Sequence, residues 1–201
     1  MGRRVLIPEC PWCDARDAAK EDVAYLPLNS SFMRIFAPAD AHFLADLLWM
    51  RSCYYFGQHA LTSREYPYLL NFLDLITDLS PQWEEPFLFG AVILPTEAEA
   101  VEDGLYLVEK GIALHPDNWE LWFFKGYYLW KHYEDKIGAA EAFHQASVLP
   151  NAPLYLTKLS ATFATRGGDR HLAIRFLQQA LKNLKDENQR KILLKKLEEI
   201  R

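Results

Sequence analysis

The chain has 201 residues, half of them hydrophobic and 24% charged, which supports a packed core and excludes a disordered chain. Residues 1–150 hold 11 basic and 22 acidic side chains, a net charge of −11, whereas residues 151–201 hold 11 basic and 5 acidic ones, a net charge of +6. The acidic body offers no basic stripe for phosphate contacts, so we expect no nucleic-acid binding.

The hydropathy of the sequence indicates the cellular compartment of the protein. No run of about 18 apolar residues occurs, so we expect no membrane-spanning helix in this chain. The apolar run near the N-terminus is too short for a secretory signal. We therefore expect a cytoplasmic protein, with the periplasm as an alternative if the sequence is a piece of a longer one.

Residues 1–25 show no helical or strand period, and we expect an N-terminal arm ahead of a folded domain of residues 26–201. In the arm, Cys10 and Cys13 have the spacing of a redox pair or of half a zinc site. No strand pattern accompanies them, and the third cysteine, Cys53, falls where we expect a buried core residue. We expect no cofactor, and we keep a metal- or redox-responsive role of the pair as an alternative.

Helical spacing of apolar residues begins after Pro38, with a long first helix whose partner is expected to be capped by Ser63. The stretch from Thr96 to Glu99 fits a capping box at the start of a later helix. Asp169 is expected to cap another helix, after a glycine turn.

The stretch from Glu65 to Glu109 holds ten acidic residues and no Lys, Arg or His. Such a stretch is typical of a solvated outer face. The alternative is a docking face for a basic partner, or for the basic end of a second copy of the chain.

Three glycines, each within an aromatic-rich helical segment, recur at intervals of 33 and 36 residues: Gly57, Gly90 and Gly126. A fourth segment carries Ala161 in the same place, and Pro81 and Pro116 close the first two units. A period near 34 residues is typical of helix-turn-helix repeat proteins. Small residues at one phase let paired helices approach closely.

With these residues the chain resembles the tetratricopeptide repeat (TPR) family, most clearly at residues 118–128 and 167–174. The resemblance implies an all-α, right-handed superhelical solenoid of about four helix-turn-helix units. The units and the closing helix are expected at residues 50–82, 83–118, 119–153, 154–186 and 187–201.

The resemblance also implies a concave groove lined by the first helix of each unit. Transferring the family's inward positions residue by residue gives Arg51, Tyr54, Gln58, Phe87, Phe123, Tyr127, Trp130, Tyr155, Lys158 and Thr162. The Lys, Arg and Asn clamp with which some members hold a carboxyl terminus is missing. Aromatic side chains dominate instead, and these are enriched at binding hot spots.

The sequence thus predicts a protein–protein interaction scaffold or adaptor that binds an apolar or aromatic peptide or helix. We expect no enzyme, because the histidines, serines and carboxylates form no catalytic motif. Self-assembly into a homo-oligomer is the structural alternative, and core packing or cover by the arm is the alternative for the groove aromatics.

Overall fold

The computed structural model describes residues 40–61, 65–184 and 186–200, together with residues 31, 33 and 35. From residue 40 on, these described residues form nine α-helices and no strand, which confirms the all-α class. The helices are α3 (Ala41–Ala60), α4 (Leu69–Leu79), α5 (Glu85–Thr96), α6 (Val101–Leu114), α7 (Trp119–Lys131), α8 (Lys136–Val148), α9 (Tyr155–Arg166), α10 (Arg170–Asn183) and α11 (Glu187–Ile200).

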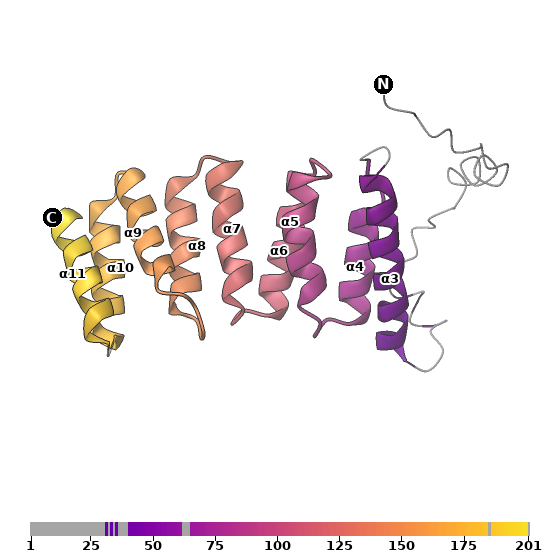
Figure 1. Cartoon of the computed structure of the whole chain (residues 1–201), viewed down its shortest axis with the longest axis horizontal. Helices are drawn as coiled ribbons and strands as arrows, with labels where there is room; N and C mark the ends of the chain where they lie inside the picture. Colours follow the sequence, from indigo (N-terminus) through magenta and orange to yellow (C-terminus); the bar gives the residue numbers. More distant parts are fainter. Residues whose placement is uncertain are drawn as a thin grey trace, which may run out of the picture.

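The helices stand side by side in a row, with α3 and α4 at one end and α11 at the other (Figure 1). Each helix packs on the next one in the chain, and α4 with α6, α5 with α7, and α9 with α11 make further contacts. The apolar core runs along the row in four clusters rather than around one centre. Local packing of neighbouring helices therefore holds the chain together.

The C-terminal ends of the helices recur at intervals of 34 to 36 residues. The odd-numbered helices α3 to α9 end at residues 60, 96, 131 and 166, with differences of 36, 35 and 35. The even-numbered helices α4 to α10 end at residues 79, 114, 148 and 183, with differences of 35, 34 and 35. The glycine spacing thus corresponds to a real period of helix pairs.

The turns inside the pairs repeat as well. Glu99, Glu134 and Gly168 lie between the two helices of three successive pairs, and their φ angles of 52°, 55° and 91° are all left-handed. Glycine adopts this conformation without strain, whereas glutamate is rare there. Two acidic residues therefore occupy a turn position that the backbone geometry suits to glycine.

Hydrogen bonds join residues one period apart. The Tyr128 hydroxyl on α7 donates to the carbonyl of Ala91 on α5 at 2.9 Å. The ring Nε2 of His115 lies 2.7 Å from the carbonyl oxygen of Pro81, and Asn118 donates to a carboxylate oxygen of Glu84. These partners are 37, 34 and 34 residues apart, and the three bonds fasten α7 and the turn before it to α5 and the turn before it.

The glycines of the central pairs lie where helices touch. A Cβ added to Gly126 would lie 2.7 Å from the Phe143 ring, and one added to Gly90 would collide with Leu107. Both residues are buried. Close approach of two helices explains why glycine is used there, although glycine costs a helix about 1 kcal/mol relative to alanine.

The predicted register of the first pair is wrong. Among the described residues, no atom lies within 4 Å of a Cβ added to Gly57, and Cys53 is exposed rather than buried. The buried face of α3 carries Ala45, Ser52 and Tyr55. Ser52, and not the adjacent Cys53, is the small residue that is buried at this position. Its hydroxyl donates to the Trp49 carbonyl at 2.9 Å, so the burial of Ser52 leaves its hydroxyl paired.

The predicted caps have mixed outcomes. Asp169 caps α10, with its carboxylate accepting from the Leu172 amide at 2.8 Å. The capping box at Thr96 is wrong, because Thr96 is the last residue of α5 and its hydroxyl donates back to the Val92 carbonyl. The α6 helix starts only at Val101. Ser63 lies outside the described residues.

Candidate functional site

Three of the predicted groove residues form an aromatic face along α7. This helix begins after Asn118, whose side-chain oxygen accepts from the amides of Glu120 and Leu121 and so fixes where the helix starts. Phe123, Tyr127 and Trp130 follow at spacings of four and three residues, which places them on one side of the helix.

The three rings of the α7 aromatic face differ in how deeply they are buried. Phe123 is the innermost ring, 5.7 Å from Phe143 and packed against the C-terminal core cluster. Trp130 is the outermost, with 41% of its surface exposed. Its indole lies 6.0 Å from the Tyr127 ring and 5.1 Å, edge-on, from Phe163 of α9. The face therefore presents a partly open aromatic surface at the contact between two helix pairs.

The remaining predicted groove residues differ in exposure. Tyr54 on α3 and Tyr155 at the start of α9 are exposed, and the Arg51 guanidinium carbon lies 5.9 Å from the centre of the Tyr54 ring. Gln58, Lys158 and Thr162 are half-buried, as is Arg51. Lys158 and Thr162 share α9 with Phe163, the neighbour of Trp130.

Phe87 does not fit the predicted surface, because its side chain is completely buried. It lies on the face of α5 that also buries Ala91 and Leu94. A Cβ added to Gly111 of α6 would lie 3.1 Å from Phe87 and 3.0 Å from Leu121 of α7. The position transferred to Phe87 therefore points into the contact with the neighbouring helices, and Phe87 is a core residue.

An acidic recess of about 240 Å³ lies at the N-terminal end of α7. It is lined by Glu84, Asp117, Asn118, Trp119, Glu120, Pro150 and Asn151. Glu84 is engaged from both sides, since Asn118 donates to it and the His115 Nδ1 atom lies 3.6 Å from its carboxylate. Three carboxylates beside an indole suit the basic side chain of a partner.

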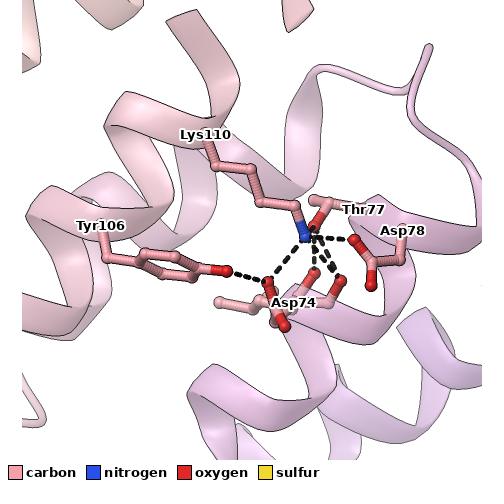
Figure 2. A network of polar contacts seen from close by, with 6 residues as sticks. Asp74, Thr77, Asp78, Tyr106 and Lys110 are labelled. Atoms are coloured by element: carbon pink, nitrogen blue, oxygen red, sulfur yellow. Dashed lines mark hydrogen bonds and ion pairs between the residues drawn. The ribbon is translucent and has the colours of Figure 1, made fainter. Parts of the chain in front are cut away.

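A second polar cluster joins α4 to α6 (Figure 2). The Lys110 ammonium lies 2.6 Å from a carboxylate oxygen of Asp74 and 2.6 Å from one of Asp78, and it donates to the Thr77 hydroxyl at 2.9 Å. The Tyr106 hydroxyl donates to Asp74 at 3.0 Å. Two acids of the long acidic stretch are thus neutralised within the chain by the first lysine that follows the stretch.

The electrostatics of this cluster favour a structural role for Lys110 over a role as a nucleophile. Burial by itself favours the neutral amine of Lys110, but hydrogen bonds and charge from Asp74 and Asp78 outweigh it, so the pKa of Lys110 is raised. A lysine nucleophile needs a lowered pKa. Asp74 and Asp78 are one helical turn apart, and a lysine follows one period later, so the sequence carries a signal for this contact.

The structure does not test the metal- or redox-responsive role of Cys10 and Cys13, because both lie outside the described residues. Although Cys53 is exposed, partial desolvation of its thiol raises the pKa, which makes it a poorer nucleophile. Among residues 40–61, 65–184 and 186–200, no group of three His, Cys, Asp or Glu side chains could hold a metal ion. No helix in the described part of the chain is both long and apolar enough to cross a membrane.

Comparison with known proteins gave no family: neither a protein-family model nor a curated protein sequence matched the chain.

Proposed function

We propose that this chain is a tetratricopeptide-like scaffold that binds an apolar or aromatic peptide, or a partner helix, along the α7 aromatic face of Phe123, Tyr127 and Trp130. The proposed architecture is a right-handed superhelical solenoid of about four units closed by α11. Its support is the period of 34 to 36 residues in helix ends, with hydrogen bonds between residues 34 to 37 apart.

The observation that carries the proposal is the half-open indole of Trp130 between Tyr127 and Phe163. A tryptophan held rigidly by two rings presents a large contact area at little cost in conformational entropy. Phe123 and Phe163 supply a rigid floor, since both pack on Phe143 in the core. A partner side chain that covers Trp130 would bury apolar surface against an ordered site.

Charge adds a second feature to the expected partner. The acidic recess of Glu84, Asp117 and Glu120 lies at the opposite end of α7 from Trp130. The helix has 13 residues, so the two ends are roughly 15 to 20 Å apart. A bound peptide with an apolar or aromatic residue at one end and a basic residue at the other would satisfy both. The proposed role is binding rather than catalysis.

The test is a peptide selection against the full chain, followed by measurement of dissociation constants for the selected peptides. Replacing Trp130 with Ala should weaken their binding by about 2–4 kcal/mol if Trp130 is a hot spot, with the circular dichroism spectrum unchanged. Leu114→Ala is the matched control, because Leu114 on α6 is similarly exposed, at 45%, and outside the face. Equal loss in both variants, or no loss with Trp130→Ala, contradicts the proposal.

A further inference from the structure

The first helix of the row is apolar on two opposite sides. One side of α3 buries Ala45, Ser52 and Tyr55 within the chain. The other side exposes Phe43, Leu47, Met50 and Tyr54, with Met50 and Tyr54 each 60% exposed. A helix that is apolar all round is normally buried all round. The exposed set, here called the α3 stripe, is therefore a surface in need of a cover.

The spacing of the α3 stripe indicates what kind of surface covers it. Its four residues are separated by four, three and four positions, which is the alternation of the two seam positions of a coiled coil. A globular core favours a wider apolar face, whereas this narrow stripe fits a single helix laid alongside. The helix has 20 residues and stands at the end of the row (Figure 1), so a partner helix can lie along it.

The charged residues beside the stripe are complementary to the same residues on a second copy of the helix. Asp46 and Arg51 lie at the positions that flank a coiled-coil seam on its two sides, five residues apart. When two copies of such a helix run in parallel, the flanking position that Asp46 occupies in one helix faces the flanking position that Arg51 occupies in the other. Asp46 of each copy then faces Arg51 of the other, which gives two ion pairs related by a two-fold axis.

We propose that two copies of this chain associate through the α3 stripe, with their α3 helices parallel about a two-fold axis and Asp46 of each copy paired with Arg51 of the other. This goes beyond the peptide-binding role, which concerns α7.

Sedimentation equilibrium of the full chain under reducing conditions tests the association, because the reductant excludes dimers linked through cysteine. We expect a dimer at micromolar concentration, and a monomer after Met50→Glu, with unchanged helicity. Leu114→Glu, an exposed leucine on α6, is the matched control and should remain dimeric. A monomeric wild-type chain, or a Met50→Glu variant that still dimerises, overturns the proposal.

A charge exchange tests the orientation. Asp46→Arg should raise the dissociation constant of the dimer by roughly tenfold, because two ion pairs become two repulsions. Adding Arg51→Asp to the same chain exchanges both charges and should restore the dimer. If the double variant keeps its helicity and stays as weak as the single one, the parallel pairing is wrong.

Discussion

In the central helix pairs, α5 with α6 and α7 with α8, a glycine lies where two helices touch, whereas in α3 the glycine of the same predicted phase faces open space. Gly90 and Gly126 are close to side chains of the helix opposite, but in the described part of the chain Gly57 has no neighbour within 4 Å of an added Cβ. Glycines at nearly the same interval thus have different surroundings. A glycine at the repeat interval indicates a helix contact only where a neighbouring helix packs on that side of its own helix.

The largest effect that separates the two regions is expected from Gly126→Leu. The Phe143 ring lies 2.7 Å from where the first added carbon would go, and Phe143 is itself held by Phe123 and Phe163. The overpacked contact should lower the free energy of unfolding by about 1–3 kcal/mol, as measured in guanidinium chloride. An unchanged denaturation midpoint would show that the two helices can move apart freely.

Besides its apolar contacts, the junction between the first pair and the central pairs holds a polar cluster centred on Lys110. Replacing Lys110 with Met would remove the cation that Asp74 and Asp78 share. Because the carboxylates are about one third exposed, solvent screens their repulsion, so we expect a loss of about 1–2 kcal/mol rather than that of a fully buried pair. Urea denaturation measures it, with Lys125→Met as the control for a more exposed ion pair, to Glu109.

The Lys110 cluster also predicts alkaline sensitivity. The pKa of Lys110 is raised above 10.5 in the folded chain, so the folded state holds this proton more tightly than the unfolded state does. Its contribution is complete below pH 10.5 and is lost as the pH rises through the folded pKa. The difference in melting temperature between the wild type and Lys110→Met should therefore shrink above pH 10.5. A difference that stays constant there would contradict the ion-pair explanation.

The opposite sign is expected at Gly57. Alanine fits there without contact and is the better helix former, so Gly57→Ala should stabilise the monomer by up to about 1 kcal/mol. Thermal unfolding at a concentration low enough to keep the chain monomeric measures the effect. A destabilised variant would mean that Gly57 packs against a part of the chain outside the described residues.

The contrast explains how much the sequence could predict. The period, the pairing of helices from residue 83 on and the cap at Asp169 follow from local rules, because a repeat buries its apolar face against its own neighbours. The closeness of Tyr127 and Trp130 follows from helical spacing. These features needed no knowledge of contacts distant in the chain.

The errors have one physical cause. Phe87 was predicted from the transferred family positions and Cys53 from its place in the expected core, but the rotation of each helix about its axis is set by what packs on it. In α5 the contacts with α6 and α7 bury Phe87, and in α3 the buried face includes Ser52 instead of Cys53. The α3 stripe was overlooked because its spacing overlaps the spacing of the core face on the same helix.

The smallest effect concerns the contact between α8 and α10, where an aromatic stack replaces the ion pairs of α4 and α6. The His144 ring lies 3.8 Å from the Phe176 ring at an angle of 10°, and its Nε2 atom is 3.2 Å from Gln179. Burial lowers the pKa of His144, although the Gln179 hydrogen bond opposes this. The unfolded chain therefore takes up the proton more readily, and stability should fall as the pH drops below 6.5.

For one histidine this loss is at most about 0.7 kcal/mol between pH 7 and pH 6. His144→Phe keeps an aromatic ring against Phe176 and removes the titration, so its urea midpoint should vary less with pH than that of the wild type. The slope is the readout, because the absolute midpoint also reflects the lost contact with Gln179. Parallel pH curves for the two proteins would mean that the α8–α10 stack tolerates the imidazolium, and that this junction, unlike the Lys110 junction, is indifferent to charge.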